Sequence, residues 1–93
     1  MSAPAVQHDA AARRYSLTVD GAAAVLDYEL AGDTVTFTHT FVPAELRGRG
    51  LAELLVRQGL ADARRDQRRV VPQCSYVARF IERHPEYQDL LGK

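Results

Sequence analysis

Hydrophobic and polar residues alternate along three stretches in the first half of the chain. Residues 15–19, 22–30 and 34–42 each follow this two-residue period, and Asp20-Gly21 and Ala31-Gly32-Asp33 separate them. Such alternation is typical of half-buried strands, and an Asp-Gly pair favours a tight hairpin turn. The pattern therefore predicts a meander of three antiparallel strands.

A helical period replaces the alternation after Gly50. Apolar or small side chains recur three and four residues apart on one broad face, and charged side chains lie largely opposite. The apolar set is Leu51, Ala52, Leu55, Val56, Gly59, Leu60 and Ala63. We predict a helix over about residues 49–68. Because glycine costs a helix about 1 kcal/mol relative to alanine, we expect Gly59 to permit a close approach to the sheet.

Two valines after this helix predict a further strand. Val70-Val71 is short, apolar and ended by Pro72, and because a helix precedes it we expect it to pair in parallel with residues 34–42. Ser75 is positioned to cap a second helix, which Pro85 ends before a last short helical turn. The predicted fold class is mixed α+β, with a mainly antiparallel sheet, one parallel pair and two packed helices.

The composition of the chain limits the classes of protein to which it can belong. The 93 residues suffice for one small domain, which we assign to residues 13–93 after a flexible start over residues 1–12. Twelve basic and twelve acidic side chains balance, so the net charge gives no reason to expect binding to nucleic acid or membranes. The single cysteine, Cys74, excludes an intramolecular disulfide, and the chain has neither a signal-peptide pattern nor an apolar run of membrane-spanning length. We therefore expect a cytoplasmic protein, and we predict no metal site.

Glycine and arginine are concentrated at the turn between the third strand and the first helix. The sequence there is Arg47-Gly48-Arg49-Gly50-Leu51-Ala52. Glycine lets a ligand approach the backbone closely, and the first amides of a helix have no intrahelical acceptor, so their N–H groups converge on an anion. The spacing differs from the dinucleotide motif G-x-G-x-x-G and from the phosphate loop G-x-x-x-x-G-K-[ST]. It has the form R-x-x-G-x-A, and it predicts a phosphate site of another kind.

Three sequence blocks occur in order along the chain. They are Phe37-Thr38-His39-Thr40-Phe41-Val42-Pro43, the turn at residues 47–52, and Val71-Pro72-Gln73-Cys74-Ser75-Tyr76-Val77 with His84-Pro85-Glu86-Tyr87. With these blocks the chain resembles the core of the GNAT acyl-CoA N-acyltransferase superfamily, and most closely its minimal YjdJ-type branch. The resemblance implies that the turn binds the pyrophosphate of acetyl-CoA. Because the chain has no room for the two helices that larger members place between their first strands, the resemblance does not name the acceptor.

The resemblance also implies a cofactor site formed by the third strand, the turn and the start of the helix. Its expected members are Thr40, Phe41, Val42, Arg47, Gly48, Arg49, Gly50, Leu51 and Ala52. Three residues near the expected thioester are candidates for catalysis, namely His39, Cys74 and Tyr76.

Each catalytic candidate has more than one interpretation. His39 shares strand parity with Phe37, so we expect its side chain on the apolar face, either as a hydrogen-bonded core histidine or as a general base. Cys74 precedes a helix whose N-terminus can stabilise a thiolate. It either carries the acetyl group as a thioester, or shapes a site in which the amine attacks acetyl-CoA directly, or is buried without a chemical role. Tyr76 either protonates the departing CoA thiolate or packs.

Two further segments have alternative interpretations. The four arginines 64, 65, 68 and 69 form either a solvated helix end or a contact for the 3′-phosphate of CoA or for nucleic acid. The His84-Pro85-Glu86-Tyr87 segment either folds the chain end back onto the core or walls the pantetheine groove.

The most concrete functional prediction is an acetyl-CoA-dependent N-acetyltransferase. Its acceptor would be a primary amine, either a protein or peptide lysine or a small amine. One alternative is a CoA-binding module or sensor without turnover, and another is a protein-interaction domain that uses the arginine face. We expect a monomer or a weak homodimer.

Overall fold

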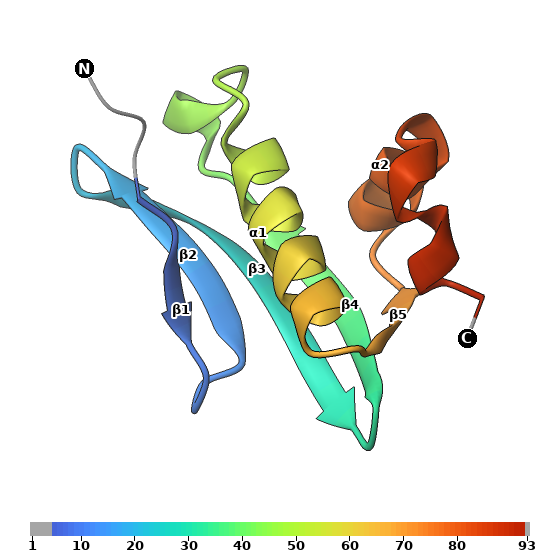
Figure 1. Cartoon of the computed structure of the whole chain (residues 1–93). Coiled ribbons are helices and arrows are strands. Elements are labelled where there is room, and N and C mark those ends of the chain that lie inside the picture. The colour runs from blue at the N-terminus through green and yellow to red at the C-terminus, as the bar shows by residue number, and fades with distance from the viewer. Residues whose placement is uncertain (1–4, 93) are drawn as a thin grey trace.

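Five strands form a sheet in the order β1-β2-β3-β4-β5 within residues 5–92, which the computed structural model describes (Figure 1). Their bounds are β1 Gln7–Asp9, β2 Arg14–Val19, β3 Ala22–Ala31, β4 Thr34–Phe41 and β5 Arg69–Pro72. Strands β1 to β4 pair antiparallel, whereas β5 pairs in parallel with β4. The predicted meander and the predicted parallel pair are both confirmed.

Two α-helices and two 3₁₀ helices complete this arrangement. They are η1 Ala44–Leu46, α1 Leu51–Arg65, α2 Ser75–Arg83 and η2 Pro85–Leu90. Helix α1 crosses one face of the sheet, and α2 with η2 lies beside it near β5 (Figure 1). The mixed α+β class is therefore confirmed, although α1 is shorter at both ends than the predicted residues 49–68. No helix in the described part of the chain is long and apolar enough to cross a membrane.

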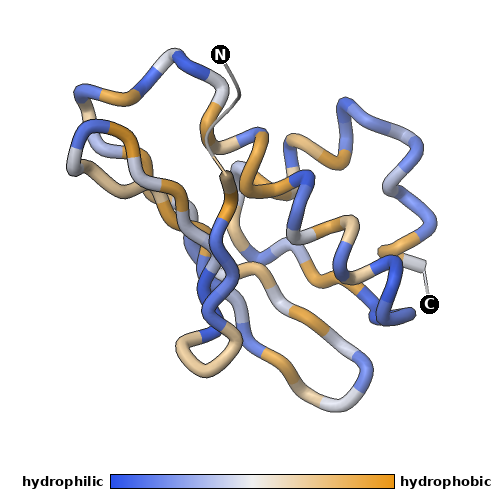
Figure 2. Tube along the Cα trace, turned by 60° about the vertical axis from the view of Figure 1, so that its left-hand side comes forward, coloured by the Kyte–Doolittle hydropathy of each residue, from blue (hydrophilic) through white to orange (hydrophobic). Residues whose placement is uncertain are grey.

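The alternation in the strands and the helical spacing in α1 direct apolar side chains to one shared core. Hydrophobic and hydrophilic segments alternate along the chain trace (Figure 2). Leu17 and Leu26 from the sheet and Leu55 and Leu60 from α1 have no exposed surface. Burial of each such side chain contributes about 1.5–3 kcal/mol relative to leaving it in water, so this contact between helix and sheet stabilises the fold strongly.

Gly59 brings α1 unusually close to the sheet. A Cβ atom at this position would lie 2.9 Å from Phe37 Cε1 and 3.3 Å from Leu26 Cδ2. Because the Phe37 ring is itself buried, it has little freedom to move away. The close approach predicted for Gly59 is confirmed.

The N-terminal segment differs from the flexible start predicted over residues 1–12. Residues 1–4 lie outside the described residues, but residues 7–9 form β1 and pair with β2. His8 fixes this short strand, because its ring stacks on Tyr15 with 4.2 Å between ring centroids and its Nε2 lies 2.7 Å from the Tyr28 hydroxyl. A single histidine therefore supplies contacts that the polar composition of the segment did not indicate.

A buried carboxylate lies under this strand. Asp62 on α1 is 8% exposed and accepts hydrogen bonds from the Tyr15 hydroxyl at 2.8 Å, from Gln58 Nε2 at 3.0 Å and from Arg65 Nη1 at 3.0 Å. Burial first, and then the hydrogen bond to Asp62, raise the pKa of the Tyr15 phenol, so Tyr15 remains a donor. The cluster ties the C-terminal half of α1 to β2.

The arginines near the end of α1 hold neighbouring segments. Arg64 donates to Asp89 at 2.8 Å and to the Glu86 carbonyl at 2.8 Å, and Arg68 donates to the Gly32 carbonyl at 3.3 Å. Arg57 Nη1 donates to the Tyr87 hydroxyl at 3.3 Å, so α1 contacts η2 at two levels. These contacts fold the His84-Pro85-Glu86-Tyr87 segment back onto α1, and they engage Arg64 and Arg68 within the protein.

Candidate functional site

A pocket of about 310 Å³ opens at the N-terminal end of α1. Strand β4, the glycine-arginine turn, the first turn of α1 and the start of α2 all contribute to its walls. The lining residues are Thr40, Val42, Leu46, Arg47, Gly48, Gly50, Leu51, Ala52 and Tyr76. The fold thus brings together side chains that lie up to 36 positions apart in the sequence, from Thr40 to Tyr76.

Most residues of the predicted cofactor site line this pocket. Phe41 and Arg49 are the exceptions among the expected set, and Leu46 is a wall residue that the sequence interpretation missed. Leu46 is 2% exposed and belongs to η1 just before the turn. Its apolar side chain beside a run of arginine and glycine was the available signal, because such a residue needs a buried surface to pack on.

The backbone of the turn leaves the first amides of α1 without intrahelical acceptors at the end of the helix that borders the pocket. Gly50 is the N-cap of α1 and has φ of 75°, a conformation that favours glycine. The first hydrogen bond of the helix runs from the Leu54 amide to the Gly50 carbonyl at 3.3 Å. The amides of Leu51, Ala52 and Glu53 therefore precede the helical ladder, and their partial positive charge favours an anion.

Arg47 is the arginine of the turn that reaches the pocket. Its Nε donates to the Val42 carbonyl at 3.0 Å, which holds the guanidinium between the end of β4 and the turn. Arg49 is exposed and does not line the pocket. Of the two arginines considered as sources of charge for a bound phosphate, Arg47 alone is placed at the pocket wall.

A β-bulge in β4 decides which side chains face the pocket. Asp27 pairs with His39 and Tyr28 pairs with Phe37, so Thr38 is an extra residue in β4. A bulge of this kind shifts the alternation by one position, so that residues before and after it point to opposite faces. Side chains that follow Thr38 therefore reverse the pattern set by Val35 and Phe37.

The prediction that His39 shares the apolar face with Phe37 is wrong for this reason. Phe37 is 1% exposed, whereas His39 is exposed and Phe41 is 47% exposed on the outer face of the sheet. Neither His39 nor Phe41 lines the pocket. His39 is thus not a core histidine, and its imidazole is separated from the pocket by the sheet itself.

Thr40 occupies the pocket-facing position instead. It pairs with the buried Leu26, and its hydroxyl Oγ1 lies 3.2 Å from Cys74 Sγ in hydrogen-bond contact. The Cys74 amide also donates to the Phe37 carbonyl at 2.9 Å. The start of α2 is thereby fixed against β4, and the thiol lies next to one wall of the pocket.

Cys74, rather than Ser75, is the N-cap of α2. The expected capping role of Ser75 is therefore wrong, because the helix begins at Ser75 itself. Burial raises the pKa of the Cys74 thiol, but the hydrogen bond with Thr40 and the backbone amides of Val77 and Tyr76 lower it more, and the net pKa is below the ordinary thiol value. The place of Cys74 at the N-terminus of α2 and the hydrogen bonds to its sulfur both favour the thiolate form of its side chain.

Tyr76 forms the wall of the pocket on the α2 side. Its side chain remains 41% exposed, and burial first, then the charge of Glu53, raise the pKa of its phenol. A phenol with a raised pKa is protonated at neutral pH and can donate a proton. Among residues 5–92, no group of three or more His, Cys, Asp or Glu side chains is placed to hold a metal ion.

Comparison with known sequences identifies a family and several relatives. A family model described as GCN5-related N-acetyl-transferase matches residues 14–90. The chain is 33% identical over 87 residues to Protein NATD1 of Danio rerio, which covers 88% of this chain and 79% of that protein. It is 30% identical over 83 residues to Protein NATD1 of Homo sapiens, which covers 86% of this chain and 74% of that protein.

The fold is also similar to the solution structure of a GCN5-like protein from Staphylococcus aureus. The TM-score is 0.77 and the identity is 24%, with 97% of this chain and 89% of that chain covered. This likeness concerns the arrangement of the strands and helices, which agrees with the predicted architecture.

Proposed function

Because this chain belongs to the GCN5-related N-acetyltransferase family, we propose that it transfers an acetyl group from acetyl-CoA to a primary amine. One observation carries the proposal: the turn, the pocket-facing side of β4 and Tyr76 line a single pocket of about 310 Å³. The acceptor in this proposal is a protein or peptide lysine or a small amine. Assignment to the minimal YjdJ-type branch is part of the same proposal, as is a single domain that comprises residues 13–93 together with strand β1. A cytoplasmic location and a monomeric or weakly dimeric state also belong to it.

The donor would bind along the pocket from the turn to the start of α2. The amides of residues 48–52 would hold the diphosphate of acetyl-CoA, with Arg47 adding charge at the wall. The pantetheine arm would then follow β4 past Val42 and Thr40. Because the Phe41 side chain points to the outer face, this residue has only its backbone to offer to the donor.

Direct transfer is the simpler of two routes. The neutral amine nitrogen attacks the thioester carbonyl carbon, the C–N bond forms, the C–S bond breaks, and the nitrogen passes one proton to solvent water, from which the Tyr76 phenolate is later reprotonated. The departing CoA thiolate takes a proton from the Tyr76 phenol, which is placed at the pocket wall. Positioning the amine against the thioester supplies much of the rate enhancement in such a reaction.

The second route passes through Cys74. Its thiolate attacks the thioester, acetyl-Cys74 forms, and CoA leaves as a thiolate; the amine then attacks acetyl-Cys74 and releases the thiol. The lowered pKa of Cys74 and its contact with Thr40 support this route. The two routes differ in one intermediate, the acetylated protein.

His39 has no part in either proposed route. It lies on the outer face, opposite Asp27 in the β3–β4 register, whereas the thioester would be bound in the pocket on the other face. Replacing His39 by Gln is therefore expected to leave kcat unchanged at neutral pH, and a loss of kcat would contradict this placement of the donor.

A CoA-binding module without turnover is the alternative. Strands β2, β3 and β4 follow one another through tight turns, so no helix between them covers the acceptor side. An open acceptor side suits a sensor as well as an enzyme with a large acceptor.

Calorimetric titration with acetyl-CoA tests the proposed donor site. Gly50→Ala is expected to weaken binding strongly, and Gly32→Ala is its matched control because both glycines have positive φ and open space at the Cβ position. Equal binding by the two variants would show that the phosphate site lies elsewhere. Mass spectrometry of an amine and peptide library incubated with acetyl-CoA then separates the two functions: acetylated product indicates a transferase, and binding without product indicates the sensor.

A further inference from the structure

A second, smaller cavity of about 140 Å³ lies between α1 and α2. It is lined by Glu53, Tyr76, Arg79, Phe80, Arg83 and His84. Tyr76 also lines the larger pocket, so the two cavities meet at this side chain. A ligand that extends past Tyr76 from the larger pocket would therefore reach this groove between the helices.

Contacts within the protein hold the floor of this groove. The His84 ring stacks on Phe80 with 4.0 Å between centroids, and the Arg57 guanidinium lies over Phe80 at 5.2 Å from the ring centroid. His84 Nδ1 donates to the Phe80 carbonyl at 2.7 Å, which fixes the imidazole on the helix. The walls are thus held in place without a ligand.

The charge of the groove is positive and uncompensated. Arg79 and Arg83 lie one helical turn apart on α2 and are both exposed. Within residues 5–92, neither guanidinium has a hydrogen bond or an ion pair. The one carboxylate among the lining residues, Glu53, is paired with Arg57 Nε at 2.8 Å.

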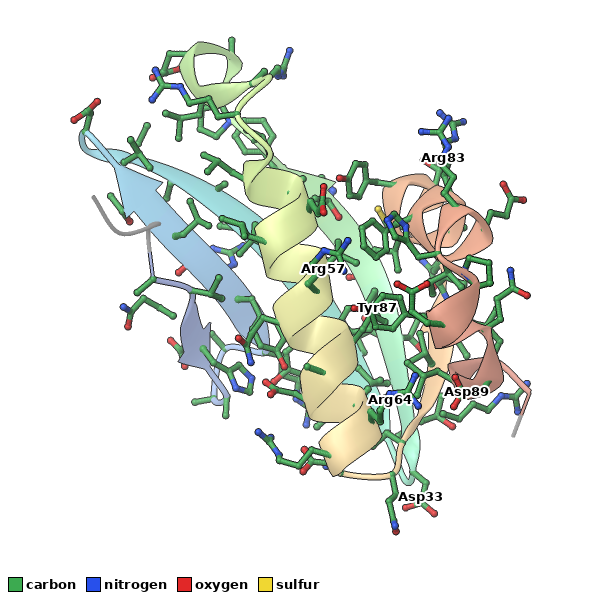
Figure 3. All side chains as sticks on the ribbon, turned by 45° about the horizontal axis from the view of Figure 1, so that its top comes forward. Asp33, Arg57, Arg64, Arg83, Tyr87 and Asp89 are labelled. Atoms are coloured by element: carbon green, nitrogen blue, oxygen red, sulfur yellow. The ribbon has the colours of Figure 1, made fainter. Side chains whose placement is uncertain are left out.

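This pair stands apart from the other arginines that face a neighbouring helix or strand. Arg57, Arg64 and Arg14 each bind a carboxylate. Figure 3 shows Arg57 and Arg64 directed from α1 toward α2 and η2, while Arg83 projects from α2 away from them. Two unpaired like charges at positions i and i+4 repel each other on a helix, so an anion placed between them would be bound favourably.

We infer that Arg79 and Arg83 bind a phosphomonoester, the 3′-phosphate of CoA, and so select CoA over its 3′-dephosphorylated form. The inference rests on the proposed function, because it requires the diphosphate to lie at the turn. The two phosphate sites differ in kind. Backbone amides suffice for the diphosphate, whereas a terminal phosphate dianion is held best by guanidinium groups, which can donate two parallel hydrogen bonds.

The arginines at the end of α1 are already engaged within the protein. The sequence made Arg64, Arg65, Arg68 and Arg69 candidates for this phosphate. Arg64, Arg65 and Arg68 each donate to a carboxylate or a backbone carbonyl, and Arg69 lines neither cavity. Arg79 and Arg83 have no such partner among the described residues, and they line a cavity that shares Tyr76 with the donor pocket. The phosphate is therefore assigned to α2.

Calorimetry with CoA and with 3′-dephospho-CoA tests the inference. The wild-type protein is expected to bind CoA about tenfold or more tightly, since a charge-assisted hydrogen bond is worth at least that factor. Arg79→Ala/Arg83→Ala should bind CoA as weakly as 3′-dephospho-CoA, with the affinity for the latter unchanged. Arg69→Ala removes an exposed arginine outside the groove and is expected to keep the wild-type preference.

The possible failures are distinguishable. Equal affinity of the wild-type protein for the two ligands would overturn the role of Arg79 and Arg83 and leave the proposed donor site intact. Binding of neither ligand would overturn the donor site, and the inference with it. Arg79→Lys/Arg83→Lys guards against a folding effect of the alanine variant: it keeps the charge, and it should retain part of the preference for CoA.

Discussion

Thr40 Oγ1 and Cys74 Sγ lie 3.2 Å apart, across the junction between β4 and the start of α2. The contact joins the pocket-facing side of the strand to the N-cap of the helix. It places a hydroxyl donor where a thiolate would need one, so the reactivity of Cys74 depends on a residue 34 positions away in the sequence.

Thr40→Val is expected to raise the pKa of the Cys74 thiol. Burial raises this pKa, and the hydrogen bond with Thr40 is the largest of the interactions that lower it. Without the Thr40 hydroxyl, the effect of burial is offset less and the pKa rises. A hydrogen bond to a charged group stabilises the charged form, so its loss disfavours the thiolate. The rate of alkylation by iodoacetamide, measured against pH, should therefore rise at higher pH in the variant. Thr36→Val, on the outer face, should leave the profile unchanged.

Tyr76→Phe is expected to lower kcat by about 10²–10⁴-fold, the usual range for loss of a positioned acid. Burial and the charge of Glu53 raise the Tyr76 pKa. The wild-type kcat should therefore persist to a pH at which a phenol with an ordinary pKa would already have lost its proton. Glu53→Gln removes one of the two causes, so the alkaline limb of the kcat profile should move to lower pH. Tyr87→Phe removes a phenol outside the pocket, and a loss of kcat as large as that of Tyr76→Phe would contradict the assignment.

Gly59→Ala is expected to destabilise the fold even though alanine is the better helix former. The added methyl group would meet the Phe37 ring at 2.9 Å, and overpacking of this kind costs about 1–3 kcal/mol. Urea denaturation measures the change in the free energy of unfolding. Ala61→Gly on the exposed side of α1 isolates the propensity term, which should be about 1 kcal/mol. A stabilised Gly59→Ala protein would show that the sheet can yield at this point.

Asp62→Ala is expected to cost more stability than Asp66→Ala. Loss of Asp62 leaves the buried Tyr15 hydroxyl without its acceptor, at a cost of about 1–3 kcal/mol. Asp66 is exposed and paired with Arg65, and such surface pairs contribute about 0–1 kcal/mol. Thermal and urea denaturation of the two variants make the comparison, and equal losses would mean that the Tyr15 hydroxyl finds another partner.

The strands, α1 and the parallel β4–β5 pair were predictable because each rests on a repeated local pattern. Residues 34–42 alternate, residues 51–65 repeat every three to four positions, and Val70-Val71 follows a helix. The close approach at Gly59 was also predictable, since a glycine on the apolar face of a helix leaves space that a neighbouring side chain fills.

The side of the sheet on which each candidate catalytic residue lies could not be predicted from a repeated local pattern. The threonine alternation runs through Thr38 without interruption, so nothing local marks this residue as the bulge that turns His39 outward. Asp62 was similarly hidden, because a carboxylate on the apolar side of a helix resembles a boundary residue until Tyr15 and Gln58 are seen to meet it. The position of the bulge and the burial of Asp62 both depend on partners that are distant in the sequence.

The extra residue in β4 has a consequence for how this chain tolerates length changes. Deleting Thr38 would restore an unbroken ladder without exchanging the faces, because Phe37 and His39 would remain opposite Tyr28 and Asp27. Thr40 would stay opposite the buried Leu26, on the side of the donor pocket and of Cys74. A ladder that kept Thr38 and paired it would instead turn Phe41 toward the pocket and Thr40 toward solvent. The pocket therefore depends on one residue being left out of the ladder as much as on the identity of the residues that line it.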